Sequence, residues 1–206
     1  MTDLEDRLRI PVPAAVRPPE LALAADREGL LDVALAVTDA PVGPLVLAAT
    51  AAGLVACSYD DAEAVAERLA RTVSPRVLRA PARLDPVRRQ LEDYFAGRRD
   101  RFSTPVDLVL ATPFARTVLT ALSTVPYGST TTYGELAARI GRPAAARAVG
   151  HALGSNPVCV VLPCHRVVGA GGRLTGYAGG VAAKRMLLEL EAGGRNTDPA
   201  TAVHLA

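Results

Sequence analysis

The chain has 206 residues, which is enough for one large domain or two small ones. Half of the residues are hydrophobic and 21% are charged, a composition typical of a soluble globular protein. The formal net charge is +2, but residues 105–206 carry nine basic and five acidic side chains, against 14 and 16 in residues 1–104. The second half is therefore the better candidate for contact with a polyanion, although a basic solvated face without a partner would look the same.

The sequence shows no pattern typical of a membrane-spanning segment or of a secretory signal. No run of about 18 uncharged apolar residues occurs, so we expect no membrane span. The N-terminus, MTDLEDRLRI, is acidic and lacks the apolar segment of a secretory signal. We therefore expect a cytoplasmic protein.

The first predicted elements follow a proline-containing arm, residues 1–29, to which we assign no function. Apolar runs bounded by turn residues predict an antiparallel meander, with strands at 32–37, 45–49 and 53–58. Two stretches of helical composition follow, at 62–72 and at 84–96, and Gly97 closes the second. Residues 30–104 are thus expected to form a small α+β domain.

The second half is predicted to be mostly helical. Apolar residues recur at helical spacing from Phe114 to Val125. Thr132 and Glu135 form a capping box, which opens a helix that runs to about Ile140. A Gly-Arg-Pro break precedes a second short helix at 144–153. Two short helices around such a turn predict a helix-turn-helix with Arg147 projecting from the second helix, and ordinary packing of two helices is the alternative.

Cys164 lies in the most informative stretch of the sequence. Three cysteines are present, an odd number that argues against a disulfide framework, and two of them are expected to be small buried hydrophobes. Residues 158–162 form an apolar, strand-like run that Pro163 ends, so Cys164 is expected where the chain leaves the core. A histidine and an arginine follow it directly, and such an electropositive setting lowers the pKa of a thiol.

The residues after Cys164 predict a pocket and an orienting group. Six glycines lie between 169 and 180, and such a loop can bring backbone groups close to a flat ligand, with Tyr177 inside it. In a helix at 181–192, Lys184 and Glu191 are seven residues apart and share a face. Glu191 would then orient His165, which would take the proton of Cys164 directly or through a water. A solvated helix face is the alternative for Lys184 and Glu191.

Several motifs together resemble one known family. These are Pro163-Cys-His-Arg-Val167, Tyr133, the Ala-Ala-Arg-Ala-Val-Gly of residues 145–150, Asn156-Pro157, and Gly176-Tyr-Ala-Gly-Gly180. In this order and spacing the chain resembles the O6-alkylguanine-DNA alkyltransferases (methylated-DNA–protein-cysteine methyltransferases), closely over residues 105–192 and loosely before them. The resemblance implies direct-reversal repair: one alkyl group moves from O6-alkylguanine, and possibly O4-alkylthymine, to Cys164.

The resemblance also implies a role for each residue of the site. Cys164 would accept the alkyl group, with His165 and Glu191 activating it. Tyr133 would rotate a phosphate and contact the flipped guanine, Val167 would accept from its amino group, and Lys184 would support the thiolate. Tyr177 and Ala178 would line the pocket. The residues that would contact the DNA are Ala145, Ala146, Arg147, Gly150 and Asn156. Arg147 would fill the gap left by the flipped base, and Asn156 would brace the turn between the DNA-reading helix and the active-site strand.

The expected fold is α+β. A small N-terminal α/β domain, RNase H-like and with antiparallel strands, would precede a mostly helical, winged-helix-like domain at 105–195 that carries the helix-turn-helix, and a tail at 196–206. The partner implied is double-stranded DNA, bound through its minor groove by a monomer. We expect no cofactor and no metal, because no motif for either is present. Without means to remove the thioether, each chain would act once.

Three features depart from the family pattern, and three other functions stay open. Leu119 stands where the family usually has Trp, and Ala178 stands where Ser is common. Cys159 occupies a position where an apolar residue or Pro is usual, and we expect it to lie in the core. The first alternative is a DNA-binding protein that flags alkylated bases without repairing them. The others are a cysteine hydrolase that uses Cys164 and His165, and a zinc site of Cys159, Cys164 and His165 with no evident fourth ligand.

Overall fold

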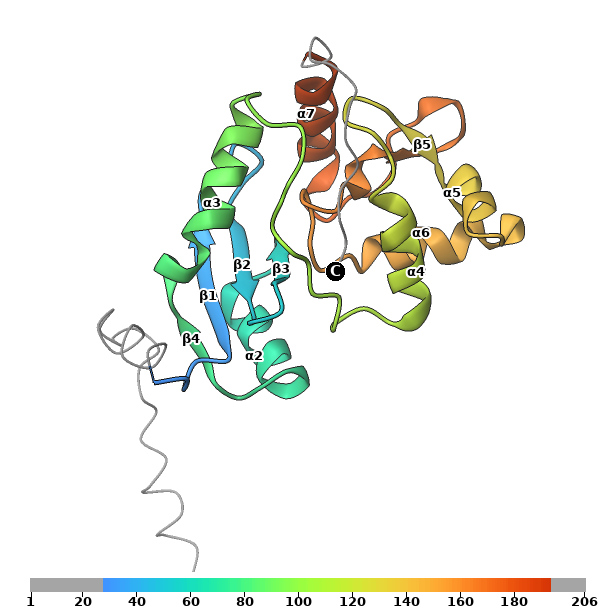
Figure 1. Cartoon of the computed structure of the whole chain (residues 1–206). Coiled ribbons are helices and arrows are strands. Elements are labelled where there is room, and N and C mark those ends of the chain that lie inside the picture. The colour runs from blue at the N-terminus through green and yellow to red at the C-terminus, as the bar shows by residue number, and fades with distance from the viewer. Residues whose placement is uncertain (1–27, 194–206) are drawn as a thin grey trace, which may run out of the picture.

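The computed structural model describes residues 28–193 (Figure 1). Most of the expected arm and the whole expected tail lie outside the described residues. The first part of the fold contains β1 (Val33–Thr38), β2 (Leu45–Ala49), β3 (Leu54–Ser58), α2 (Ala62–Thr72), β4 (Val77–Arg79) and α3 (Pro81–Phe95). The second part contains α4 (Pro113–Leu122), β5 (Thr131–Thr132), α5 (Tyr133–Arg139), the 3-10 turn η1 (Pro143–Ala145), α6 (Ala146–Gly154), η2 (Cys164–Arg166), β6 (Val167–Val168), η3 (Ala170–Gly172) and α7 (Gly180–Gly193).

The first part is built on one four-stranded sheet in the order β3-β2-β1-β4. The three strands β1 to β3 form the antiparallel meander that the sequence predicts. The sequence reading missed β4, which has three residues and pairs with β1 in parallel. A strand this short carries too few residues for an alternating pattern to be recognised.

Both faces of this sheet are buried, which explains why its strands are continuously apolar. Along β1, Val33 and Leu35 pack with α2, whereas Ala34 and Ala36 belong to the core on the opposite face. That second core contains the buried side of α3, and Figure 1 shows α3 and α2 on either side of the strands. α3 begins at Pro81, earlier than expected, because proline fits the first turn of a helix.

The second part contains the predicted helix-turn-helix. The capping box forms as expected: Thr132 Oγ1 accepts from the backbone of Glu135, whose carboxylate accepts from the backbone of Thr132. The second helix is split into the 3-10 turn η1 and α6. α4, α5 and α6 pack against one another, and Leu119 of α4 is fully buried, so leucine fills the position where the family usually has Trp.

The expected strand at 158–162 is absent. Only Val158 makes a β-bridge, with Cys57 of β3, and the chain then turns, with Val160 at φ 70°. The run is apolar because it lies buried between the two parts, and burial alone does not make a strand. Backbone hydrogen bonds join the parts here, from Cys57 N to Pro157 O and from Cys159 N to Cys57 O, both 2.8 Å long.

The fold class is thus α+β, with a sheet-containing part followed by a helical part. The segment between them runs along the free edge of β3, where Leu54 N donates to Pro105 O. Gly53 permits this approach, since a Cβ there would lie 2.5 Å from that same oxygen. Within residues 28–193 no helix is both long and apolar enough to cross a membrane.

Candidate active site

Cys164 begins the 3-10 turn η2 and is 7% exposed. The buried side chain of Asn156 forms hydrogen bonds with the backbone of the turn that precedes Cys164. Its Nδ2 donates to Leu162 O at 3.0 Å and to Cys164 Sγ at 3.2 Å, and its Oδ1 accepts from Val158 N at 3.0 Å. One buried amide therefore fixes both the turn and the sulfur atom that follows it.

Glu191 of α7 is the centre of a buried hydrogen-bond cluster. Its carboxylate accepts from His165 Nε2 at 2.9 Å, from Arg166 Nε and Nη2, each at 2.9 Å, and from the Tyr94 hydroxyl at 2.7 Å. The backbone of Gly128 donates as well, at 3.1 Å. Glu191 and His165 are fully buried, so the alternative of a solvated helix face is wrong for Glu191.

The charges in this cluster determine the protonation of His165. Burial alone would raise the pKa of Glu191, but hydrogen bonds from His165 and Arg166 outweigh it and hold that pKa at about 2. Burial lowers the pKa of His165, so its ring is neutral at pH 7. Because an ionised carboxylate only accepts, Nε2 carries the hydrogen and Nδ1 keeps its lone pair. Nδ1 is buried and has no hydrogen-bond partner within the described part of the chain.

Lys184 of α7 is also buried. Only 1% of it is exposed, so the solvated-face alternative is wrong here too. Its Nζ donates to the backbone oxygen of Val167 at 2.6 Å, and this bond fixes the strand that follows η2. Burial lowers the pKa of Lys184, and the nearby Cys164 acts in the opposite direction.

The surroundings of Cys164 favour its thiolate. The neighbouring Cys159 thiol, the hydrogen bond from the Asn156 amide and the positive charge of Lys184 lower the pKa of Cys164 against the effect of burial. The other two cysteines are buried, as expected, and burial raises the pKa of Cys57 to about 12. Within the described residues no group of three or more His, Cys, Asp or Glu side chains is arranged to hold a metal ion.

A cavity of about 260 Å³ opens onto Cys164. Its lining contains the predicted site residues Tyr133, Gly150, Cys164, Tyr177 and Ala178, together with Leu153, Gly154 and Gly176, to which the sequence assigned no role in the site. Backbone-rich walls of this kind suit a flat ligand that is read by its edges.

Two tyrosines of the cavity are held by residues outside it. The Tyr133 hydroxyl lies 2.6 Å from Thr175 Oγ1, and the Tyr177 hydroxyl lies 3.4 Å from that of Tyr59, just after β3. The Tyr59 ring lies so close to Gly179 that a Cβ there would be 2.5 Å from it. Gly179 therefore makes room for the Tyr59 ring, which comes from the sheet-containing part. Gly180, the next residue, adopts a φ of 82°, a conformation that favours glycine.

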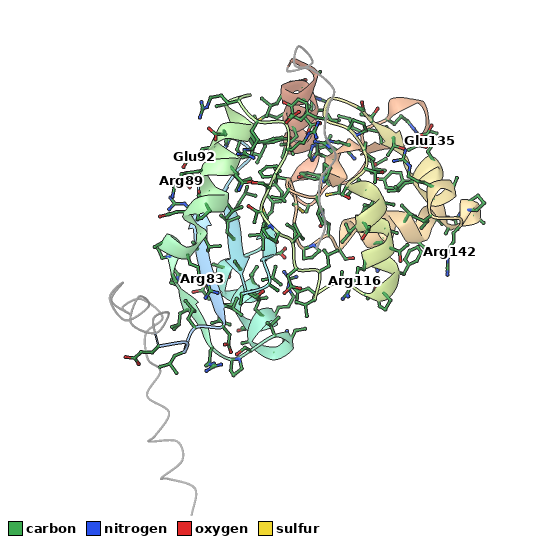
Figure 2. All side chains as sticks on the ribbon, viewed as in Figure 1. Arg83, Arg89, Glu92, Arg116, Glu135 and Arg142 are labelled. Atoms are coloured by element: carbon green, nitrogen blue, oxygen red, sulfur yellow. The ribbon has the colours of Figure 1, made fainter. Side chains whose placement is uncertain are left out.

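The other residues predicted to contact DNA lie in α6 and just before it. Ala145 and Ala146 are half-buried at the start of α6, and Arg147 is exposed, without a partner in the described part of the chain. Gly150 lies one turn further, and its Cα position faces the Tyr133 ring. Figure 2 shows another arginine, Arg142, at the turn before α6 and on the outside of the molecule.

Sequence reasoning missed three contributors to the site. Arg166 was noted only as a positive neighbour, but it is the main ionic partner of Glu191. Tyr94 and Tyr59 come from the sheet-containing part, about 70 to 120 residues from the groups they contact, and no local pattern marks such pairs. Tyr94 is the last buried residue of the apolar stripe of α3, and in the sequence it reads as ordinary core.

Comparisons with known proteins agree with this geometry. Residues 113–193 match the model of the 6-O-methylguanine DNA methyltransferase DNA-binding domain, and residues 21–108 match that of the ribonuclease-like domain of the same family. A methylated-DNA–protein-cysteine methyltransferase of Mycobacterium tuberculosis is 44% identical over 153 residues, which are 74% of this chain and 88% of the relative. One of Methanosarcina acetivorans is 42% identical over 159 residues, 76% and 96% of the two chains.

A solved structure of similar shape includes nucleic acid. The crystal structure of Mycobacterium tuberculosis OGT in complex with DNA superposes with a TM-score of 0.69 at 41% identity, over 78% of this chain and 94% of that one. A structure of the O6-methylguanine methyltransferase from the same organism gives a TM-score of 0.65 at 40% identity, over 81% and 96%.

Proposed function

Because the chain belongs to the 6-O-methylguanine DNA methyltransferase family, we propose that Cys164 is the residue with which it takes alkyl groups from damaged DNA. The activity is direct-reversal DNA repair, in which an alkyl group passes from the DNA to a cysteine of the protein. Of the three cysteines, all of which the structure describes, Cys164 alone lines the cavity. This position, together with its lowered pKa, is the observation that carries the assignment.

The proposed reaction is a single displacement. The Cys164 sulfur attacks the alkyl carbon on O6, a sulfur–carbon bond forms, and the carbon–O6 bond breaks with its electron pair passing to the guanine, which takes up a proton. His165 removes the thiol proton through its free Nδ1, directly or through a water, while Glu191 holds the ring by Nε2. The product is a thioether, which no group of the site can reverse, so we propose one turnover per chain.

The base would be recognised by backbone and tyrosine groups around the cavity. The Tyr133 hydroxyl would donate a hydrogen bond to the purine ring that leaves. The side chain of Tyr177 would form the wall of the cavity against which that ring packs. The carbonyls of Cys164 and Val167 would accept from the guanine amino group, and the second of them is already positioned by Lys184. Because Ala178 brings no hydroxyl to this edge, the O6 leaving group depends more on Tyr133 and on backbone amides.

Access to O6 requires the damaged nucleotide to leave the duplex, at a cost of roughly a few kcal/mol. We propose that α6 enters the minor groove, since its small residues allow a close approach, and that Arg147 fills the space of the flipped base. Its exposed side chain without a partner is what supports this role. We further propose that the protein acts as a monomer in the cytoplasm, a reducing compartment that suits three free thiols.

Stoichiometry tests the function. The wild-type protein, mixed with a molar excess of duplex that contains O6-methylguanine, is expected to remove one lesion per chain and then stop. Chromatography of the digested DNA counts the lesions that remain. Continued removal after one equivalent would contradict single turnover, and no removal with tight binding would instead support the non-repairing DNA-binding alternative.

The finger role of Arg147 predicts a substrate-dependent defect. Arg147→Ala is expected to slow repair of duplex DNA about tenfold or more, which corresponds to about 1.4 kcal/mol, because the flipped state loses a filling side chain. Its reaction with free O6-benzylguanine should stay near the wild-type rate, since a free base needs no flipping. Single-turnover rates on both substrates measure the ratio. Arg185→Ala removes the same charge from an exposed position of α7 and serves as the control. Equal losses on both substrates would refute the role.

A further inference from the structure

Tyr59 lies behind the wall of the cavity that opens onto Cys164, and it has no part in the proposed reaction. It follows β3 and does not line the cavity, but its ring meets that of Tyr177 edge-on, with the ring centroids 5.6 Å apart and the ring planes at 73°. The two hydroxyl oxygens lie 3.4 Å apart, and among the described residues Tyr59 is the one hydrogen-bond partner of the Tyr177 hydroxyl. The wall of the cavity therefore rests on a side chain from the sheet-containing part.

The same ring also fixes the backbone that follows Tyr177. The three atoms nearest to a Cβ at Gly179 would all belong to the Tyr59 ring, the closest of them 2.5 Å away. Gly179 has no positive φ, so alanine fits its backbone conformation and only the ring excludes it. Gly180 N donates to Tyr177 O at 2.9 Å and closes a turn. Tyr59 thus contacts this turn at two places, the Tyr177 side chain and Gly179.

The backbone on both sides of Tyr59 is held, so its ring cannot retreat without cost. Before it, two backbone hydrogen bonds, each 2.8 Å long, join Cys57 of β3 to residues 157–159 of the turn that precedes Cys164. After it, the carboxylate of Asp61 accepts from two backbone amides and caps α2. The fold therefore fixes where Tyr59 stands relative to the acceptor cysteine.

We propose that Tyr59 is a positioning residue that limits the size of the alkyl group: it acts through Tyr177, which it holds in place opposite Cys164. The alkyl group has to lie between the guanine and the attacking sulfur, in the cavity of about 260 Å³ that Cys164 and Tyr177 both line. Without the Tyr59 ring, the Tyr177 ring has space to move outward, and the cavity gains room. The effect on size rests on the proposed alkyl transfer to Cys164, whereas the contacts of Tyr59 do not.

Two alkyl groups in the same duplex measure this effect. Single-turnover rates are determined with O6-methylguanine and with O6-benzylguanine at one position of one duplex, so the cost of extruding the nucleotide cancels in their ratio. Tyr59→Ala is expected to slow methyl transfer, because the wall is no longer held, and to give the benzyl group room. The ratio of the benzyl to the methyl rate should therefore rise about tenfold.

Three further variants separate the ring from its hydroxyl and from general stability. Tyr59→Phe loses only the long contact between the hydroxyls, so its ratio should stay within about twofold of the wild type. Tyr59→Leu fills part of the space and should raise the ratio less, and it replaces Tyr59→Ala if that variant does not fold. Val65→Ala is the control, because Val65 is buried on the α2 side of the sheet and its loss lowers stability while the ratio stays unchanged.

A mutant cycle with Gly179 tests the contact itself and needs no DNA. In the wild type, Gly179→Ala places a methyl group against the Tyr59 ring and is expected to lower the midpoint of urea unfolding. In Tyr59→Ala the same methyl group has room, so it should lower the midpoint no further.

Equal losses with both alkyl groups in folded Tyr59→Ala would overturn the proposal, because a merely structural role slows both alike. A lowering of the midpoint by Gly179→Ala that is the same with and without the Tyr59 ring would overturn it as well. If the wild type transfers neither group while the unfolding cycle shows the expected coupling, the proposed function fails and the hold of Tyr59 on the loop stands.

Discussion

Cys164→Ser is expected to leave O6-methylguanine in DNA at the level of an untreated duplex, while binding of that duplex persists. A serine hydroxyl ionises far above the range of a thiol, so the site would hold no usable nucleophile although the cavity keeps its shape. The other cysteines cannot replace it. Burial raises the pKa of Cys57 to about 12, and Cys159 does not line the cavity. The measurement is the fraction of lesions left after a long incubation with excess protein, with binding followed by gel shift.

Cys57→Ala provides the matched control for this result, since it removes a buried thiol outside the cavity and should repair at the wild-type rate. Residual repair by Cys164→Ser, beyond the spontaneous loss of methyl groups, would mean that another residue accepts the alkyl group.

Glu191→Ala is expected to lower the free energy of unfolding by about 3–5 kcal/mol, because it leaves a buried guanidinium without its ionic partner. Arg166 is 7% exposed and donates to Glu191 through two of its nitrogens. The Tyr94 hydroxyl and the ring of His165 would lose their acceptor in the same step. Urea unfolding measures the change. Glu189→Ala, two residues earlier and exposed, should change stability by less than about 0.5 kcal/mol.

The same carboxylate makes stability depend on acid. The pKa of Glu191 in the folded protein, about 2, lies below its ordinary value of 4.5, so its contribution of about 3 kcal/mol is present above pH 4.5 and is lost as the pH falls toward 2. The lowered pKa of His165 acts with the same sign, because the unfolded chain binds its proton first as the pH falls. Glu191→Gln should therefore flatten the acid limb of the stability curve. An acid limb identical to that of the wild type would show that the cluster does not contribute.

The parts of the site that come from one stretch of sequence were predictable. The capping box at Thr132 and the seven-residue spacing of Lys184 and Glu191 are local patterns, and the structure shows both. The pattern did not reveal that Lys184 and Glu191 are buried, because a charged pair on a helix looks the same on a solvated face. Burial follows from groups elsewhere, Val167 O for the lysine and Arg166 for the glutamate.

The parts that join the two halves of the chain were not predictable. Tyr94 and Tyr59 reach the site from α3 and from the end of β3, and a single sequence carries no signal for such distant contacts. The turn at 158–162 was mistaken for a strand, since a side-chain amide, that of Asn156, satisfies the backbone there in place of a sheet. The sheet-containing part therefore does more than accompany the helical part: it holds both Glu191 and Tyr177 in place.

The central claim is that Cys164 accepts the alkyl group, and mass spectrometry tests it most directly. The intact protein, after exposure to an oligonucleotide duplex with O6-methylguanine, is expected to gain the mass of one methyl group, and peptide mapping should place that group on Cys164. A methyl group on another residue, on Cys159 for instance, or an unmodified protein that has nevertheless repaired the DNA, would contradict the account.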